Sequence, residues 1–531
     1  MLETSTLRLP RPRTAQGRLR SVACIAALVI ASLSGCASLP SLEGRNASFA
    51  VTDTAATRLG RAVATAVAAH PGKTGIHPLP APRDAFAARV LLAGAAERSL
   101  DIQYYIWHDD QTGTLLYEAA WRAAERGVRV RILLDDANTP GLDATIAALD
   151  AHPNIEVRLY NPLMQRQARL VNFVTDFTRV NRRMHNKSFT ADNQATIVGG
   201  RNIGDEYFAA GEGVAFADLD VLAIGPAVRK VSEAFDLYWN SPSAYPAARV
   251  IAPAAADGAA VLEARFGEVR AGTEAIAYVE AVRGTPLVQD LLAGRLPLEW
   301  ASAEVVRDDP AKTLDTEGRT DVLLLSALLP AIGRPERFFD LVSPYFVPGV
   351  EGTAMLQRLA QGGVKVRVLT NSLVATDVPS VHAGYAKRRC DLLRAGVELY
   401  ELKPSASVRN ITTKGESGAS STVQLHAKTF ELDHQRIFVG SFNFDQRSAH
   451  LNTEMGLVID SPVLARRISD ALDTDLAQNA YTVRIAADGR CPEWVERTAA
   501  GDVNHDVEPG TRASQRAWIR FLEELPIEWL L

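Results

Sequence analysis

Two short stretches of the chain repeat the same residue types at the same spacing. The first is His185–Asp192, followed by Gly199–Asn202, and the second is His426–Asp433, followed by Gly440–Asn443. In each, a lysine follows the histidine by two residues. Residues i and i+2 of an extended strand point to the same face, so each stretch places an ammonium group beside an imidazole. The pattern predicts a site that handles a phosphate group without a metal ion.

Two such motifs facing each other would surround one phosphate with imidazoles, ammonium groups and amides. A histidine titrates near neutral pH, so it can act as a nucleophile when neutral and as a general acid when charged. Lysine and asparagine side chains can hold the non-bridging oxygens during transfer. We expect the working groups to be His185, Lys187, Asn202, His426, Lys428 and Asn443.

The segments before the two motifs also repeat, which indicates an internal duplication. Three predicted strands of the first half match three of the second: Leu100–Tyr105 with Phe338–Tyr345, Gly127–Leu133 with Gly363–Leu369, and Ile155–Tyr160 with Gly396–Tyr400. Helical patterns lie between them, which is typical of βαβ units. The sequence therefore predicts an α/β fold of two pseudo-symmetric lobes, each a mixed, mainly parallel sheet flanked by helices, with one shared active site.

The same patterns give provisional domain boundaries. We expect a signal peptide at 1–36, a tether rich in Ala, Thr, Gly and Pro at 37–83, and the first lobe at 84–240. An Ala-rich region at 241–320 has no obvious counterpart, and we interpret it as an insertion that joins the lobes. The second lobe and a C-terminal tail fill 321–531.

The N-terminus has the features of a targeting segment. Several arginines precede the short apolar stretch Val22–Leu33, which closes on Leu33–Cys36 and resembles a bacterial lipobox. Acylation of Cys36 would hold the protein on the extracytoplasmic side, at the periplasmic face or the outer membrane. An uncleaved anchor and an ordinary signal peptide are the alternatives. The substrate is then expected in the membrane.

Composition limits the classes of partner and cofactor. The chain has 531 residues, 47% of them hydrophobic, and a net charge of −5, which argues against nucleic acid as the main partner. No His/Cys cluster has the spacing of a zinc site, so we expect neither a metal nor another cofactor. Cys390 and Cys491 could pair in an oxidising compartment, but a single spacing does not decide this, and we expect two unrelated buried thiols.

These motifs resemble the phospholipase D superfamily, whose signature is matched in both copies. Further stretches resemble bacterial cardiolipin synthases and their C-type branch: Asp101–Asp109, Asn181–Phe208, Thr370–Ser372, Leu425–Glu454 and Leu525–Leu531. The resemblance covers the chain from about Asp84 onward. It implies transfer of a phosphatidyl group from phosphatidylethanolamine or phosphatidylglycerol to phosphatidylglycerol, through a phosphatidyl-histidine intermediate.

The resemblance also implies roles for carboxylates. Glu454 matches the family's orienting glutamate of the second lobe, and Asp218 is its first-lobe counterpart, with Asp220 as the alternative. The motif residues Asp192 and Asp433 are expected to support the fold. We favour His185 as the nucleophile and His426 as the acid, although the pseudo-symmetry leaves the opposite assignment open.

Other readings of the same residues remain. A phospholipase D that hydrolyses phospholipids to phosphatidic acid would carry the same motifs, and so would a catalytically silent lipid-binding membrane protein. We expect a monomer, because both half-sites lie in one chain, and leave open whether a partner protein is needed.

Two peripheral segments carry weaker signals. Arginines and phenylalanines between Pro162 and His185 suit either an anionic lipid surface or a solvated helix. The tail residues Trp518–Leu522 and Trp529–Leu531 are expected to dock on the protein body, with insertion into a membrane interface as the alternative. The lone His382 is expected to be structural.

Overall fold

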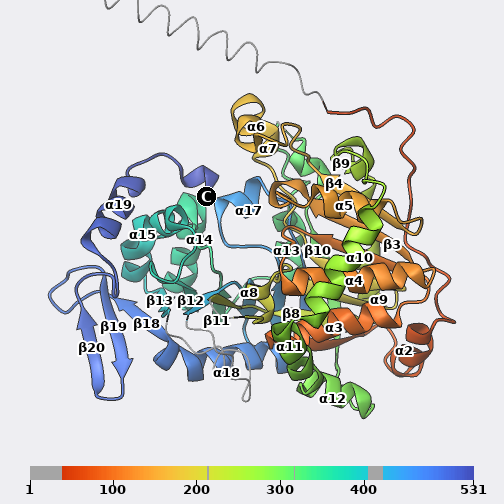
Figure 1. Cartoon of the computed structure of the whole chain (residues 1–531). Coiled ribbons are helices and arrows are strands. Elements are labelled where there is room, and N and C mark those ends of the chain that lie inside the picture. The colour runs from red at the N-terminus through yellow and green to blue at the C-terminus, as the bar shows by residue number, and fades with distance from the viewer. Residues whose placement is uncertain (1–38, 212–213, 316, 405–421) are drawn as a thin grey trace, which may run out of the picture.

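The computed structural model describes residues 39–211, 214–315, 317–404 and 422–531. Two lobes of similar construction lie side by side, the first on the right of Figure 1 and the second on the left. Their strands belong to one 18-stranded sheet, because β1 (Thr74–Leu79) of the first lobe pairs with β10 (Glu299–Arg307) of the second. The predicted α/β fold of two pseudo-symmetric lobes is confirmed.

The first lobe contains, after β1, the following elements in chain order: α3 (Pro82–Ala95), β2 (Ser99–Tyr104), α4 (Gln111–Glu125), β3 (Arg129–Asp135), α5 (Asp143–Asp150), β4 (Ile155–Tyr160), α6 (Arg169–Thr175), α7 (Phe177–Val180), β5 (Ser188–Ala191), β6 (Ala195–Gly199), α8 (Asp205–Phe208), β7 (Val214–Ala217), β8 (Asp220–Ile224), α9 (Pro226–Trp239) and β9 (Ala244–Pro246). The sheet order is β9-β4-β3-β2-β5-β6-β8-β1.

The second lobe contains, after β10, a matching series: α13 (Leu324–Ile332), β11 (Phe338–Val342), α14 (Gly349–Gln361), β12 (Lys365–Asn371), α15 (Pro379–Arg394), β13 (Glu398–Leu402), β14 (Thr422–Leu425), β15 (Thr429–Leu432), β16 (Arg436–Gly440), α17 (Gln446–His450), β17 (Met455–Asp460), α18 (Pro462–Asn479) and β18 (Ala480–Arg484). Its sheet order, β10-β17-β16-β15-β11-β12-β13-β18, repeats that of the first lobe.

Parallel pairing is less extensive than the sequence predicts. It is confined within the large sheet to β2-β3-β4 and to β11-β12-β13, while the strands that follow each motif pair antiparallel. The reason is that β5 and β6, like β15 and β16, are joined by tight turns whose residues have positive φ, such as Asp192 (51°) and Asp433 (54°). A tight turn returns the chain alongside itself and forms a hairpin.

Equivalent buried ion pairs show how closely the lobes repeat. Arg131 Nε lies 2.7 Å from Asp101 Oδ1 in the first lobe, and Arg367 Nε lies 2.7 Å from Asp340 Oδ1 in the second. In both lobes the arginine and aspartate sit on neighbouring parallel strands, in register with each other. All four side chains are buried, so the pairing neutralises charge inside each sheet layer.

The segment expected as a tether is packed onto the first lobe from Leu39 onward. Arg45 donates hydrogen bonds to the carbonyl oxygens of Asn240, Ser241 and Ala244. Residues 58–69 form α2 (Arg58–Ala69), and β1 is a strand of the main sheet. The tether prediction is wrong for these residues. Backbone N–H and C=O groups of an Ala- and Gly-rich stretch can form their hydrogen bonds with protein side chains as well as with water, so such a stretch can pack on the fold.

The predicted insertion at 241–320 also needs correction. Its last part is β10, which pairs with β17 as β1 pairs with β8, so the second lobe begins there. The helices α10 (Gly258–Ala271), α11 (Thr273–Arg283) and α12 (Pro286–Leu292) have no second-lobe counterpart at this point of the chain. They pack on α3, α4 and α5 and extend the first lobe's core with Phe266 and Tyr278.

The lobes meet along an apolar layer. Ile76, Val198 and Val221 of the first lobe pack in one cluster with Val439 and Leu457 of the second. Helices α9 and α18 contribute to the same cluster. This continuous core fixes the two motifs relative to each other.

The C-terminal tail docks on the second lobe through Ile519, whereas Trp518, Phe521 and Trp529 are more than half exposed, so the docking prediction holds only in part. After the hairpin of β18, β19 (Glu493–Thr498) and β20 (Gly501–His505), α19 (Ala513–Glu523) packs Ile519 against Leu373 and Ala383. His382 lies in the same region, where its Nε2 is 2.7 Å from Glu508 Oε1, so its surroundings are structural.

Cys390 and Cys491 form a disulfide, with Cα atoms 5.9 Å apart. The prediction of two separate thiols is wrong, because the fold brings together residues that are 101 positions apart in the chain. Cys36 and the rest of the predicted signal peptide lie outside the described residues. Within the described ranges, no helix has the length and apolar character needed to cross a membrane.

Candidate active site

The first motif histidine is oriented by a carboxylate of the second lobe. His185 lies in the extended segment just before β5, and its Nδ1 is 2.8 Å from Glu454 Oε2 and 3.1 Å from Oε1. Its backbone N–H donates to the carbonyl oxygen of Thr453, the residue before Glu454. The contact therefore holds both the backbone and the ring of His185 against the second lobe.

The second motif histidine is oriented by the first lobe in the same way. His426 Nδ1 lies 2.5 Å from Asp218 Oδ2, and the His426 backbone N–H donates to the carbonyl oxygen of Ala217. The strands that lead to these two residues, β14 and β7, pair in parallel across the lobes. Each carboxylate fixes one ring nitrogen, which leaves Nε2 of each histidine for a reacting group.

This crossed pairing differs from an arrangement in which each lobe orients its own histidine. Glu454 and Asp218 are both beside a motif histidine, but each contacts the histidine of the other lobe. Asp220, the alternative to Asp218, instead accepts hydrogen bonds from Arg89 and from the backbone N–H of Arg201. The sequence of one repeat does not show that its carboxylate contacts the histidine of the other repeat.

Burial and nearby charges shift the pKa values of both histidines and of both carboxylates that orient them. Burial lowers the pKa of His185 well below its usual value, and the charges of Lys187 and Lys428 add to this effect. Burial also lowers the pKa of His426, with a contribution from Lys428, while Asp218 opposes the change. Both imidazole rings are therefore biased towards the neutral form.

The carboxylates differ more strongly than the histidines. Burial raises the pKa of Glu454 to about 7, against the opposing influence of Lys187 and of hydrogen bonds from Ser441 and Ser448. Burial would also raise the pKa of Asp218, but His426 and Lys428 outweigh it and lower the pKa below its usual value. Asp218 is thus a fixed anion, whereas Glu454 titrates near neutral pH.

The two lysines are buried within the same site. Lys187 and Lys428 are each 1% exposed, and each ammonium group donates to the backbone carbonyl oxygen of its own motif histidine. Burial lowers the pKa of Lys187 well below its usual value and that of Lys428 to about 8. A phosphate anion between them would supply the missing countercharge.

The two asparagines occupy equivalent positions after β6 and β16 and are both buried. Asn202 accepts from the backbone N–H of Ile106 and donates to the Tyr207 hydroxyl at 3.0 Å. Asn443 Oδ1 is buried with no hydrogen-bond partner. Asn202 is therefore set in place by neighbours, and Asn443 keeps unused hydrogen-bonding capacity.

The motif aspartates contact backbone amides. Asp192 accepts from the N–H groups of Glu97, Arg98 and Ser99, at the start of β2. Asp433 accepts from three equivalent N–H groups at the start of β11, those of Glu336, Arg337 and Phe338. These bonds fasten each hairpin to the start of the neighbouring strand.

Sequence reasoning missed the groups that surround the histidines. The Tyr105 ring lies edge-on to His185 with ring centres 4.9 Å apart, and Tyr207 lies similarly against His426 at 5.2 Å. Ser441 and Ser448 both donate to Glu454. All four residues lie in stretches that carry the family resemblance, and Ser441 also follows the motif glycine, but the sequence does not show that they surround the histidines.

Glycine is required at one of these positions. A side chain at Gly200 would overlap the Asp218 carboxylate. The missing side chain at Gly200 therefore lets the Asp218 carboxylate approach the backbone, where it orients His426.

One group outside the motifs has the residue types of a metal site. His108, Asp110 and Glu206 place ligand atoms within 4.8 Å of one another at the surface. Asp110 already caps α4 by accepting from the N–H of Gly113, and it also accepts from the N–H of Asp205. The group is thus accounted for by local hydrogen bonds.

Comparison with known proteins agrees with this geometry. The family model described as "Cardiolipin synthase, PLD-like domain" matches residues 91–239 and 328–476, one match in each lobe. Cardiolipin synthase C of Escherichia coli (strain K12) is 47% identical over 488 residues, which cover 89% of this chain and 100% of the relative. A cardiolipin synthase of Staphylococcus aureus (strain Mu50) is 26% identical, over 71% of this chain and 62% of the relative.

A solved structure supports the fold independently. Phosphatidylserine synthase of Haemophilus influenzae Rd KW20 superposes with a TM-score of 0.55 at 15% identity, covering 89% of this chain and all of the other. Two lobes, two complete motifs and one enclosed pair of histidines define a phosphatidyltransferase of the phospholipase D type. The chain belongs to the cardiolipin synthase family of phospholipase D-like proteins.

Proposed function

We propose that the protein is a cardiolipin synthase that moves a phosphatidyl group from one phospholipid to the free glycerol hydroxyl of phosphatidylglycerol. The donor is phosphatidylethanolamine or a second phosphatidylglycerol. The observation that carries the proposal is the crossed pairing, in which His185 is held by Glu454 and His426 by Asp218. Two oriented imidazoles in one site suit a reaction that needs a nucleophile and an acid together.

In the first half of the reaction, Nε2 of His185 attacks the phosphorus of the donor. A P–N bond forms, the P–O bond to the head-group alcohol breaks, and His426 gives its proton to the departing oxygen. The low pKa of His185 keeps its ring neutral and available for attack. The fixed negative charge of Asp218 opposes the lowering of the His426 pKa by burial and so stabilises the protonated ring that this step uses.

In the second half, the two histidines work in the reverse direction. His426 takes the proton of the acceptor hydroxyl, whose oxygen attacks the phosphorus while the P–N bond to His185 breaks. Cardiolipin leaves and the starting protonation states return. Lys187, Lys428, Asn202 and Asn443 hold the non-bridging oxygens through both steps.

We also propose that the protein is a lipoprotein acylated at Cys36, held on the extracytoplasmic side. The sequence Leu33–Cys36 and the preceding basic and apolar segments support this location. The Cys390–Cys491 disulfide supports it too, because such bonds persist in oxidising compartments. A membrane location places the enzyme beside its phospholipid substrates.

Lipid turnover tests the reaction directly. The full-length protein is incubated with vesicles of phosphatidylglycerol, with and without phosphatidylethanolamine. The lipid products are then separated and identified by mass spectrometry. Cardiolipin is the expected main product. Phosphatidic acid as the main product would show a hydrolase instead, and the absence of any turnover would favour a lipid-binding role.

Trapping tests the proposed intermediate. Protein quenched in alkali during turnover is digested, and the peptides are searched for an added phosphatidyl group. We expect the addition on His185, because its ring is neutral before substrate binds. An addition on His426 would exchange the two roles.

A further inference from the structure

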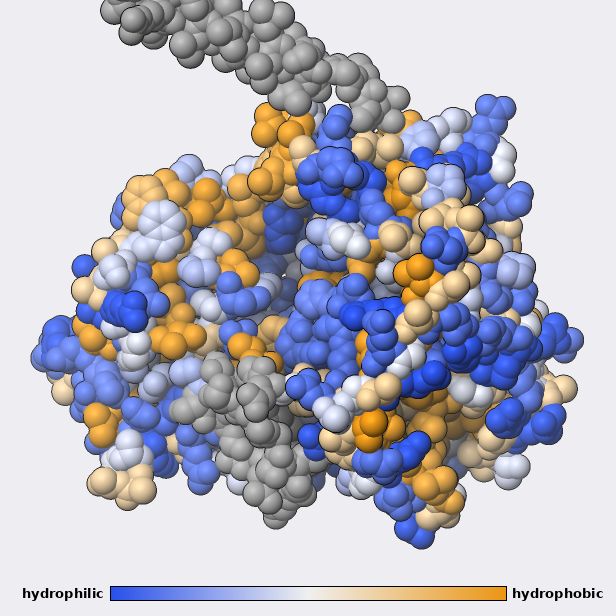
Figure 2. Space-filling model, in the orientation of Figure 1, coloured by the Kyte–Doolittle hydropathy of each residue, from blue (hydrophilic) through white to orange (hydrophobic). Residues whose placement is uncertain are grey.

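Helix α6 exposes apolar side chains where a surface helix normally exposes polar ones. Leu170 and Val174, one turn apart, are 82% and 86% exposed, and Phe173 and Phe177 beside them are 36% and 41% exposed. Leu170, Phe173 and Val174 lie at i, i+3 and i+4 on one face of α6, and Phe177 is the first residue of α7. Figure 2 shows the resulting apolar patch over α6, near the top of the molecule.

The opposite side of α6 is polar and faces the protein. Asn172 is 3% exposed, donates to the carbonyl oxygen of Gln165 and accepts from the N–H of the same residue. Folding in water normally buries the apolar face and exposes the polar one. The reversed arrangement indicates that another apolar phase covers the outer face.

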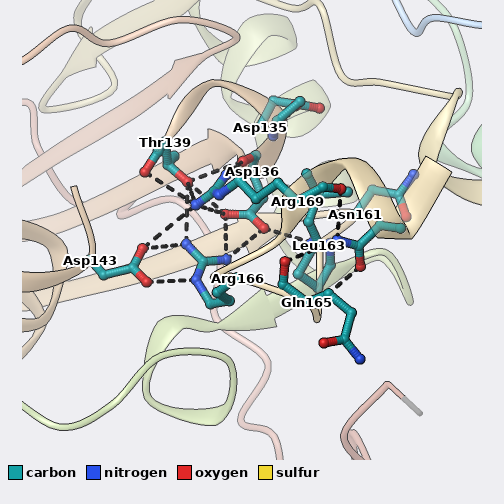
Figure 3. A network of polar contacts seen from close by, with 12 residues as sticks. Asp135, Asp136, Thr139, Asp143, Asn161, Leu163, Gln165, Arg166 and Arg169 are labelled. Atoms are coloured by element: carbon teal, nitrogen blue, oxygen red, sulfur yellow. Dashed lines mark hydrogen bonds and ion pairs between the residues drawn. The ribbon is translucent and has the colours of Figure 1, made fainter. Parts of the chain in front are cut away.

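An ion-pair network holds this helix in place, as Figure 3 shows. Arg166 donates to the buried carboxylate of Asp136 at 2.8 Å and also pairs with Asp143, while Arg169 donates to the backbone carbonyl oxygen of Asp136. The arginines of this segment therefore bind acids and carbonyls of the protein itself. Of the two interpretations of the segment, binding of anionic lipid by these arginines loses its support, and the phenylalanines do not enter the core.

The segment that carries the apolar face leads along the chain to the first motif and is linked to the C-terminus. Helix α7 ends at Val180, five residues before His185. Arg447 donates to the backbone and side-chain oxygens of Asn181 and, through Nε, to the carbonyl oxygen of Leu530. Trp529, beside Leu530, is 55% exposed, so an indole lies close to the same surface.

The start of the described chain lies on the same side of the molecule. The coloured chain begins at the top of Figure 1, the side on which α6 lies. Arg45 and Arg249 fasten the residues that follow Leu39. Cys36 is three residues earlier, and three residues span about 11 Å at most. A lipid on Cys36, as proposed above, would therefore hold this side of the protein at the bilayer.

We propose that the outer face of α6 and α7, together with Trp529, enters the phospholipid bilayer and turns the active site towards it. The inference rests on the proposed membrane location. Aliphatic and phenylalanine side chains partition into the acyl region, and indole rings favour the interface. The short link to Cys36 restricts the orientations that the protein can take.

The orientation is tested with single dyes on the full-length protein. Val174→Cys on α6 is compared with Leu292→Cys on α12, a residue that is 78% exposed and lies at the opposite end of the molecule in Figure 1. Each carries an environment-sensitive dye and is bound to vesicles of phosphatidylglycerol and phosphatidylethanolamine with or without brominated acyl chains. We expect brominated lipid to quench the dye at 174 at least about twofold more than the dye at 292, because contact with acyl chains requires insertion.

Equal quenching at the two positions, or stronger quenching at 292, would overturn the inference. Labelling of the parent chain reports free thiols at Cys24 and Cys36, and peptide mapping of the dye assigns it to one or the other, so the anchor is tested separately. The dye readout does not depend on catalysis, which distinguishes failure of the surface from failure of the proposed reaction.

A second variant tests the effect on turnover. Leu170→Asp with Val174→Asp is expected to lower turnover of phospholipid in vesicles by about tenfold, because charged side chains resist insertion. Turnover of short-chain phospholipids below their micellar concentration should stay unchanged. Leu292→Asp is the matched control and should change neither. A tenfold loss with both substrates, or no loss with vesicles, would contradict the proposal.

Discussion

The two halves of the site are built alike but are not equivalent. In the half around His185, the carboxylate is a glutamate whose pKa is raised by burial to about 7 and which accepts hydrogen bonds from two serines. In the half around His426, it is an aspartate whose pKa is lowered by His426 and Lys428 despite its burial. Two repeats of one motif thus produce one histidine beside a titrating acid and one beside a permanent anion.

The difference follows from side-chain length and from the residue after each motif glycine. Asp218 is short and approaches the backbone of Gly200, where a larger residue would overlap it. Glu454 is one carbon longer, and its lobe has Ser441 at the equivalent position, whose hydroxyl fills the space and donates to the carboxylate. Small changes around a duplicated motif therefore give the two histidines carboxylates of different acidity.

The largest effect is expected from removing either histidine. His185→Ala and His426→Ala should each lower kcat/KM by at least about 10³-fold, because a nucleophile and an acid that act as a unit fail together. Initial rates of lipid turnover in vesicles measure the loss. Activity close to that of the parent in either variant would show that the two histidines do not form one site.

The carboxylates should separate the two half-sites by their pH dependence. Asp218 raises the pKa of His426, so Asp218→Asn lowers that pKa further. The protonated fraction of His426 is lost as pH rises through its pKa, so the alkaline limb of kcat/KM should move to lower pH, with about 10²-fold loss at neutral pH. Glu454→Gln is the matched variant and should leave the alkaline limb in place. Equal shifts of the alkaline limb in both variants would show that the two carboxylates are equivalent, contrary to this prediction.

The disulfide should distinguish the lobes in stability. Replacing Cys390 and Cys491 with serine opens a loop of 101 residues and should lower the free energy of unfolding of the second lobe by about 3 kcal/mol. Chemical denaturation, followed by hydrogen exchange in each lobe, measures the change. Reductant should reproduce it in the parent and have no effect on the double variant. Equal loss of protection in the first lobe would contradict the prediction.

The smallest effect is expected from a hydroxyl that only one half-site has. Ser441→Ala removes a hydrogen bond that lowers the pKa of Glu454, so that pKa should rise above about 7. More Glu454 is then protonated at pH 7, and the acid limb of the pH profile should move to higher pH with a loss of about threefold to tenfold at neutral pH. Measuring the profile across neutral pH tests the sign. A shift to lower pH would show that Ser441 does not act through Glu454.

The sequence was a good guide to the residues of the site and to their duplication. The spacing of His185, Lys187 and Asn202 recurs at His426, Lys428 and Asn443. Such a spacing can be read from the sequence because it does not depend on the fold. Strand and helix patterns placed the two lobes for the same reason, since alternation of buried residues is a local property. The lobe boundaries were less accurate, because β1 and β10 are defined by their partners in the sheet.

The sequence by itself determined that the chain holds two copies of a phosphate-handling motif, and therefore which side chains can react. Only the tertiary structure decided that Glu454 serves His185 and Asp218 serves His426, that Cys390 reaches Cys491, and that α6 turns its apolar face outward. All three depend on contacts between segments far apart in the chain or on which face of an element meets the protein. A linear pattern carries residue types and intervals, but the partner across a lobe interface is set by the packing of the whole fold.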